Sequence, residues 1–168
     1  MIALVGFMGA GKTSVGRALA GRLELPFVDV DETIERKTNE TIGALFRAHG
    51  EPGLRAIESE VVAELLGGPN SVVALGGGSV EDPRCRELLR DATVIYLDVD
   101  GKEALGRIKG GGAGRPMLDT HDPETLHRRR RPLYESVADV TVSTDGRGVD
   151  EVVEELVAAL ERLDSQPA

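Results

Sequence analysis

The chain has 168 residues, of which 40% are hydrophobic and 29% are charged, an ordinary composition for a soluble protein with one hydrophobic core. Its net charge of −9, its 3% aromatic content and its lack of Trp argue against nucleic-acid binding, which requires gathered basic residues. A single cysteine excludes an intrachain disulfide and a cysteine metal cluster. No apolar run approaches the roughly 18 residues needed to span a membrane.

The start of the chain leads directly from Met1 into an apolar segment, which leaves no room for a signal peptide. We therefore expect one cytoplasmic domain, residues 1–168, that binds neither nucleic acid nor a membrane. The pattern shows no internal repeat and no linker between domains.

Short apolar segments alternate with amphipathic stretches along the chain. The segments that predict strands are Ile2–Val5, Phe27–Val30, Ser71–Leu75, Thr93–Leu97 and Val140–Val142. The stretches that predict helices are residues 12–23, 32–37, 41–49, 53–67, 83–91, 101–109, 123–137 and 149–163. Asp82-Pro83 and Asp122-Pro123 each read as a helix N-cap followed by Pro at the first helical position. The alternation predicts an α/β fold, a parallel sheet covered by helices on both faces.

The run from Gly6 to Thr13, GFMGAGKT, matches the P-loop pattern G-x-x-x-x-G-K-S/T in full. It follows the first predicted strand and precedes the first predicted helix, which is the context in which this motif binds phosphates. Lys12 is expected to reach the β- and γ-phosphates, and the Thr13 hydroxyl to ligate Mg²⁺. The sequence therefore predicts a nucleoside triphosphate site.

Two aspartates, Asp29 and Asp31, end the second predicted strand. In open parallel sheets, ligands gather at the carboxyl ends of strands. If the segment is extended, both side chains lie on the same side of it. One carboxylate could hold Mg²⁺ through water, and the other could hold an acceptor hydroxyl and take its proton. The alternative is a solvated strand end in which Asp31 caps a helix.

Arg55 and Glu58 are spaced to share one face of a helix. They are either an exposed ion pair of little energetic value or an oriented guanidinium that binds a substrate carboxylate, and spacing alone does not decide. The run Gly76-Gly77-Gly78 follows the third predicted strand, where glycines allow backbone N–H groups to approach a ligand. Of the four arginines 128–131, at most two can face one site, because helical positions fan around the axis.

Four glycines within residues 110–114 precede Arg115-Pro116. Such a stretch does not form a stable helix. We interpret residues 110–122 as a lid that carries Arg115 over the phosphates, since a kinase must exclude water from the transferred group. The alternative is a flexible surface connection.

Together these features resemble the shikimate kinase family. The shared elements are the P-loop with its continuation Ser14-Val15-Gly16, Asp29-Val30-Asp31, Arg55-Ala56-Ile57-Glu58, Gly76-Gly77-Gly78, Arg115-Pro116, and Arg130-Arg131-Pro132-Leu133-Tyr134. They occur in the family's order over nearly the whole chain. The P-loop by itself indicates only a nucleotide-binding protein, and the combination with the other motifs is specific to this family.

The resemblance implies a three-layer αβα fold with a five-stranded parallel sheet in the order 2-3-1-4-5. It implies transfer of the ATP γ-phosphoryl group to the 3-hydroxyl of shikimate, in the route to chorismate and the aromatic amino acids. We expect the protein to be a monomer. The implied shikimate-binding region is about residues 31–60.

The resemblance also assigns roles to individual residues. The implied catalytic residues are Lys12, Asp31 and Arg115. The implied ATP-binding residues are Gly9, Ala10, Gly11, Lys12, Thr13, Ser14, Arg115 and Arg147, the last packing against adenine. The implied shikimate-binding residues are Asp31, Arg55, Glu58, Gly76, Gly77, Gly78 and Arg130. Thr13 and Asp29 are the implied Mg²⁺ residues.

Three positions depart from the family pattern. Leu54 stands where many members have Phe in the substrate pocket. Ile108 stands near a position where relatives often have a second arginine against adenine, for which the neighbouring Arg107 is a candidate substitute. The lid is richer in glycine than usual. The alternatives considered are a gluconate-type or nucleotide-type kinase on the same fold, and a regulatory ATP-binding relative without catalysis.

Overall fold

The computed structural model describes residues 1–109 and 122–165. Its centre is a five-stranded parallel sheet in the order β2-β3-β1-β4-β5, which confirms the expected topology. The strands are β1 (Ile2–Val5), β2 (Phe27–Asp29), β3 (Val72–Ala74), β4 (Thr93–Asp98) and β5 (Val140–Ser143). Central β1 pairs on both sides, with Leu4 beside Ala74 of β3 and Ile95 of β4.

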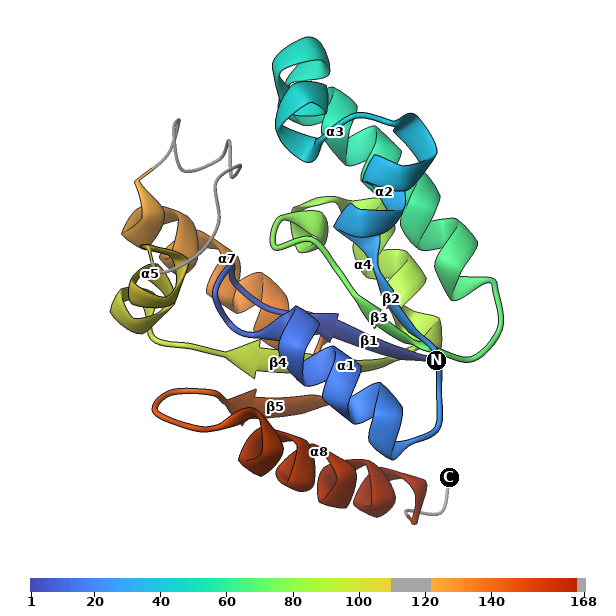
Figure 1. Cartoon of the computed structure of the whole chain (residues 1–168), viewed down its shortest axis with the longest axis vertical. Helices are drawn as coiled ribbons and strands as arrows, with labels where there is room; N and C mark the ends of the chain where they lie inside the picture. The colour runs from blue at the N-terminus through green and yellow to red at the C-terminus, as the bar shows by residue number, and fades with distance from the viewer. Residues whose placement is uncertain (110–121, 166–168) are drawn as a thin grey trace.

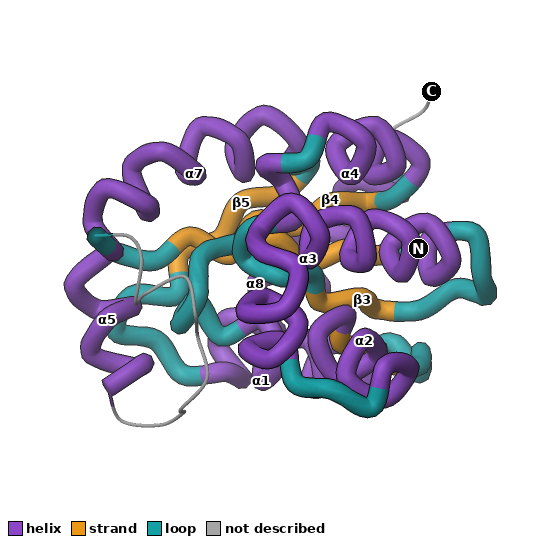
Figure 2. The backbone as a smooth tube through the Cα atoms, turned by 90° about the horizontal axis from the view of Figure 1, so that it is seen from above, coloured by secondary structure: helices purple, strands orange, loops and turns teal. Residues whose placement is uncertain are grey.

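The helices cover both faces of this sheet, as predicted from the alternation. They are α1 (Lys12–Arg22), α2 (Val30–Thr38), α3 (Ile42–Leu66), α4 (Pro83–Leu88), α5 (Gly101–Lys109), α7 (Pro123–Val137) and α8 (Val149–Asp164), with short 3-10 turns η1 (Ser79–Glu81) and η2 (Leu89–Asp91). Helix α1 packs against α8 along one face (Figure 1). Figure 2 shows α4 and α7 above the strands and α1 below them.

Burial explains why the strands are continuous apolar runs. Every residue of β1 and β3 is buried, and so are the four middle residues of β4, because helices cover both faces. The carboxyl ends of all five parallel strands lie at one edge of the sheet, and the P-loop leaves β1 there. Helices α2 and α3 stand above the same edge in Figure 1, where they can enclose a ligand.

The boundary between β2 and α2 differs from the prediction. Strand β2 ends at Asp29, and Val30 already belongs to α2. The Asp29 carboxylate caps this helix by accepting hydrogen bonds from the backbone N–H groups of Asp31 and Glu32, at 3.0 and 3.4 Å. The prediction that residue 30 is in a strand, and that residue 31 continues it, was therefore wrong, because a local cap outweighed the strand preference of Val30.

Helix α3 joins the two helices predicted at 41–49 and 53–67. The join is a sharp change of direction at Gly50, whose φ of 67° and ψ of −177° are not helical. The predicted caps Asp82 and Asp122 are both formed, with their carboxylates accepting from the backbone of Arg84 and Thr125 at 2.8 Å each. In the described part of the chain, no helix is long and apolar enough to cross a membrane.

Candidate active site

The P-loop turns tightly between β1 and α1. Gly9 and Gly11 have φ values of 82° and 90°, and a Cβ on Gly9 would lie 2.6 Å from the carbonyl oxygen of Ala104. Only glycine fits both requirements at position 9. The Lys12 ammonium donates to the carbonyl oxygens of Gly6 and Phe7 at 2.8 and 3.1 Å, so the charge lies over the loop. The loop and the N-terminus of α1 thus form an anion-binding corner.

The other two predicted P-loop residues differ in exposure. Ala10 is fully buried, and its backbone N–H donates to the carbonyl oxygen of Phe7 at 3.1 Å. Ser14 is exposed in the first turn of α1. His127 of α7 packs edge-on against Phe7, with ring centroids 5.0 Å apart, and its Nε2 lies 2.9 Å from the carbonyl oxygen of Val99. The sequence offered no spacing signal for this contact, which ties α7 to the P-loop.

Thr13 and Asp29 meet at the start of α1. The Thr13 hydroxyl donates to Asp29 Oδ2 at 2.9 Å, while Oδ1 of the same carboxylate caps α2. Donation leaves the lone pairs of the hydroxyl oxygen available for a metal ion, and Mg²⁺ prefers one or two protein oxygens together with phosphate and water. The donor chemistry of these two residues fits Mg²⁺.

Asp31 lies in the first turn of α2, above the same edge of the sheet. Its side chain is accessible to solvent, yet protein surrounds it on most sides. Desolvation raises its pKa from 3.8 to about 6, and the negative charges of Glu58 and Asp29 add to the effect. The charges of Lys12 and Arg55 oppose the rise. A carboxyl with this pKa is suited to accept a proton near neutral pH.

Arg55 and Glu58 form the ion pair expected from their spacing, with Arg55 Nη1 donating to Glu58 Oε2. The pair is not on the surface, because only 14% of the Arg55 side chain is exposed and Glu58 is buried. Arg55 Nη2 also lies 3.4 Å from a carboxylate oxygen of Glu51. This burial argues against the reading of an idle surface pair.

The three glycines after β3 lie among these side chains. A Cβ on Gly76 would overlap Glu58 Oε1 and come within 3.2 Å of Asp31 Oδ1. A Cβ on Gly78 would overlap the Arg55 guanidinium. The glycines therefore let the carboxylates and the guanidinium approach the backbone closely, which a larger residue would prevent.

Arg130 is the one buried member of the arginine run, with 1% of its side chain exposed. Its Nε and Nη2 donate to Glu81 Oε2 at 2.9 and 2.7 Å. The neighbouring side chain of Tyr134 donates its hydroxyl to the carbonyl oxygen of Gly77. Arg128, Arg129 and Arg131 are exposed, in agreement with the expectation that at most two of the four face a site.

Arg107 connects the P-loop to the turn after β5, a role that the sequence did not reveal. Its Nη1 donates to the carbonyl oxygen of Gly9 at 3.1 Å and to the Thr144 hydroxyl at 3.0 Å. Arg147, predicted to pack against adenine, lies in that turn and pairs with Glu155 of α8 at 2.7 Å. The signal for Arg107 in the sequence was its place beside Ile108, where relatives often have an arginine against adenine, but the link to Gly9 was not predicted.

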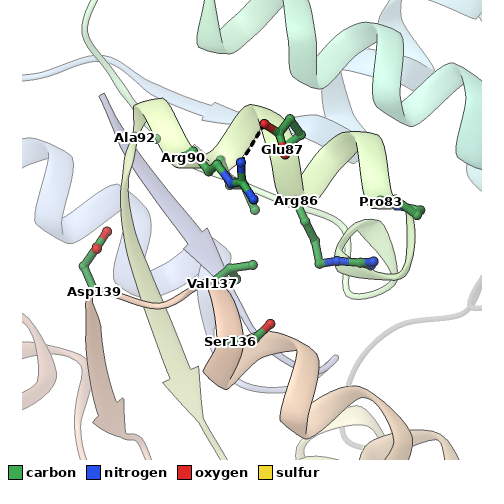
Figure 3. Close-up of a pocket in the computed structure, with 9 residues that line it drawn as sticks. Pro83, Arg86, Glu87, Arg90, Ala92, Ser136, Val137 and Asp139 are labelled. Carbon is green, nitrogen blue, oxygen red and sulfur yellow. Dashed lines mark hydrogen bonds and ion pairs between the residues drawn. The ribbon is translucent and has the colours of Figure 1, made fainter.

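Residues 110–121 of the predicted lid (110–122), Arg115 among them, lie outside the described residues, so the lid and the role of Arg115 stay predictions. The other predicted site residues lie at the carboxyl edge of the sheet. A separate surface cavity of about 550 Å³ opens at the opposite edge, between α4 and the end of α7 (Figure 3). Ala92 and Asp139, which precede β4 and β5, line it together with Arg86 and Arg90. It is remote from the P-loop and is not part of this site.

A P-loop beside an aspartate with a raised pKa, the buried Arg130 and the partly buried Arg55 defines a P-loop kinase for a small acceptor. The shikimate kinase family matches residues 8–161. The shikimate kinase of Rhodococcus jostii (strain RHA1) is 45% identical over 161 residues, covering 94% of this chain and 95% of that protein. The chain belongs to the shikimate kinase family.

Solved structures agree with this assignment. The structure of shikimate kinase from Acinetobacter baumannii in complex with shikimate has a TM-score of 0.90 and 36% identity, covering 98% of this chain and 94% of that one. A gluconokinase from Sinorhizobium meliloti has a TM-score of 0.63 and 20% identity, covering 96% of this chain and 91% of that one. The second likeness shows a shared fold only.

Proposed function

We propose that this chain transfers the γ-phosphoryl group of ATP to the 3-hydroxyl of shikimate, giving shikimate 3-phosphate. The observation that carries this function is the position of Asp31. Its carboxyl has a raised pKa and is electrostatically coupled both to the P-loop Lys12 and to the Arg55–Glu58 pair. Shikimate kinases are ATP-using kinases, and family membership supports the choice of acceptor.

Each end of the acceptor has a matching group. Shikimate is a small carboxylate with several ring hydroxyls. Arg55, which is partly buried, and Arg130, which is buried, supply guanidinium groups for the carboxylate. The planar fork of N–H donors on a guanidinium matches the two oxygens of a carboxylate. Glu58 orients Arg55. Gly76, Gly77 and Gly78 would form the floor, where Gly76 and Gly78 let Glu58 and Arg55 lie against the backbone.

Asp31 accepts the proton of the attacking hydroxyl in this scheme. Catalysis of phosphoryl transfer consists mainly of positioning the reactants and stabilising the charge on the transferred group. Lys12, together with the predicted lid residue Arg115, balances the negative charge on the transferred group. Gly9, Ala10, Gly11 and Ser14 complete the phosphate-binding segment at the N-terminus of α1.

Mg²⁺ would be held by Thr13 and, through water, by Asp29, and it would neutralise charge on the phosphates. Arg147 is proposed to contact the adenine ring. Arg107 keeps the turn that carries Arg147 next to the P-loop.

Transfer is direct and in line, without a phosphorylated enzyme. The single cysteine, Cys85, is buried, and burial raises its pKa to about 12, so its thiol is not a nucleophile. Covalent label on the protein after incubation with γ-labelled ATP would contradict direct transfer.

The experiment that tests the function is a coupled assay of ADP release with ATP and Mg²⁺. Shikimate, gluconate and nucleoside monophosphates are compared as acceptors. ADP release that depends on shikimate alone is expected. Binding of ATP without shikimate-dependent release would instead support a regulatory relative, and release with gluconate would support a gluconate-type kinase.

A further inference from the structure

Glu81 lies between the two arginines proposed to bind the substrate carboxylate. Its Oε2 accepts from Arg130 Nε and Nη2 at 2.9 and 2.7 Å and is 4.0 Å from Arg55 Nη2. Its Oε1 accepts from Nε and Nη2 of Arg129 at 3.0 and 2.6 Å. One protein carboxylate thus already has the partners that an acceptor carboxylate needs.

The burial of the three side chains makes this contact strong. Arg130 is 1% exposed, Arg55 is 14% exposed and Glu81 is 18% exposed. A buried guanidinium needs a counter-ion, since an uncompensated buried charge is strongly destabilising. Without substrate, Glu81 supplies that charge to Arg130.

The backbone that carries Glu81 is anchored independently of this contact. Arg86 Nη1 donates to the carbonyl oxygens of Val80 and Glu81, at 2.6 and 3.1 Å. The Glu81 backbone N–H donates to the carbonyl oxygen of Gly78 at 2.9 Å, within η1. The turn after the three glycines therefore holds the Glu81 backbone beside the site independently of Arg130, and keeps the side chain within reach of the arginines.

The formal charges of this cluster balance without a ligand. Three arginines face three glutamates: Arg55, Arg129 and Arg130 against Glu51, Glu58 and Glu81. An incoming carboxylate consequently meets a cluster with no net positive charge. The negative charge of Glu81 also lies beside the two arginines, Arg55 and Arg130, that the incoming carboxylate would bind. Repulsion between the Glu81 carboxylate and the substrate carboxylate opposes binding.

We propose that Glu81 is an internal counter-ion which the substrate carboxylate replaces, so that Glu81 sets the affinity of the site for its anionic acceptor. This inference rests on the proposed function, because it takes Arg55 and Arg130 as the carboxylate-binding residues. An opposing view is that Glu81 only holds Arg130 in place. The two views predict opposite changes when the charge is removed.

The test compares Glu81→Gln with the wild-type enzyme in steady-state kinetics. If Glu81 competes with the substrate, the KM for shikimate falls by about three- to tenfold, while the KM for ATP is unchanged. Melting temperature without shikimate falls, because Arg130 loses its counter-ion, and the stabilisation caused by saturating shikimate becomes larger than in the wild type. A KM for shikimate that rises or stays the same would overturn the proposal.

Two further variants make the result specific. Glu81→Asp keeps the charge but shortens the side chain, so the KM for shikimate falls by a smaller factor than in Glu81→Gln. This variant also serves as the test if Glu81→Gln does not fold. A raised KM for shikimate in Glu81→Asp overturns the proposal. Glu87→Gln removes the same charge from an exposed pair with Arg90 and leaves both KM values unchanged. Shikimate turnover by the wild type tests the proposed function separately. The ratio of the KM for shikimate in the variant to that in the wild type tests the role of Glu81 alone.

Discussion

Replacement of Asp31 by Asn should abolish turnover and at the same time stabilise the protein near neutral pH. The fold raises the pKa of this carboxyl from 3.8 to about 6, mainly through desolvation. Two pKa units correspond to about 3 kcal/mol of disfavoured ionisation. Because the side chain is accessible to solvent, screening reduces the recoverable part to about 1 kcal/mol.

The sign of the pH dependence follows from proton binding. Between pH 3.8 and about 6, the folded protein binds this proton more tightly than the unfolded chain does. The contribution of Asp31 to stability is therefore fully present below the unfolded pKa and is lost as the pH rises through about 6. Asn does not ionise, so the Asp31→Asn protein escapes this loss.

Thermal unfolding at several pH values measures the effect. We expect the Asp31→Asn protein to melt about 2–4 °C above the wild type at pH 7.5, the shift that about 1 kcal/mol gives in a protein of this size. The difference should narrow as the pH is lowered from about 6 to about 4. Glu60→Gln, on an exposed position of α3, serves as the control and should show no comparable trend.

Turnover of the same variant tests the chemical role. Removal of a general base lowers the rate by about 10²–10⁴-fold, and ATP binding should remain largely intact. In the wild type, kcat/KM for shikimate should fall on the acid side with an apparent pKa near 6. Near-normal turnover of Asp31→Asn would remove Asp31 from the base role. A lower melting temperature at pH 7.5 would refute the argument that the fold disfavours its charge.

Three other substitutions probe separate parts of the site, and a fourth, Gly16→Ala, is a control. Arg55→Ala should raise the KM for shikimate by about tenfold or more with little change for ATP, as expected for loss of a charged hydrogen bond, and equal losses for both substrates would undo its assignment. Gly78→Ala should also raise the KM for shikimate, because the added methyl group displaces the guanidinium of Arg55. In the control Gly16→Ala, the added methyl group overlaps the Phe27 ring, so the melting temperature should fall while both KM values stay near normal. Arg107→Met should raise the KM for ATP by about five- to tenfold through loss of the link to Gly9, and an effect on shikimate alone would argue against that link.

Much of the fold follows from local patterns. The buried strand β1 and the P-loop could be located from the sequence, because an apolar run, special glycines and a following helix are all encoded within a few residues. The caps at Asp82 and Asp122 were predicted for the same reason, since a cap is a contact between near neighbours in the chain.

The segment around Asp29 and Asp31 differs from its predicted structure. Asp29 and Asp31 were read as two side chains on one face of a strand, yet Asp29 caps the helix that contains Asp31. Strand and helix preferences compete over these residues, and the hydrogen bonds of the cap decide between them. The consequence is that Asp31, in the first turn of α2, is electrostatically coupled to the Arg55–Glu58 pair.

Sequence by itself determined the order of the elements, the P-loop and the motif residues that mark the family. Tertiary structure decided what surrounds those residues: it buried Arg130 among four consecutive arginines, brought Glu81 to it from a different segment of the chain, and joined Arg107 to the P-loop. The physical reason is that burial and charge pairing depend on segments that meet only when the sheet is assembled, and no short window of sequence contains both partners. The pKa of Asp31 is such a property, because neighbours from several separate segments set it.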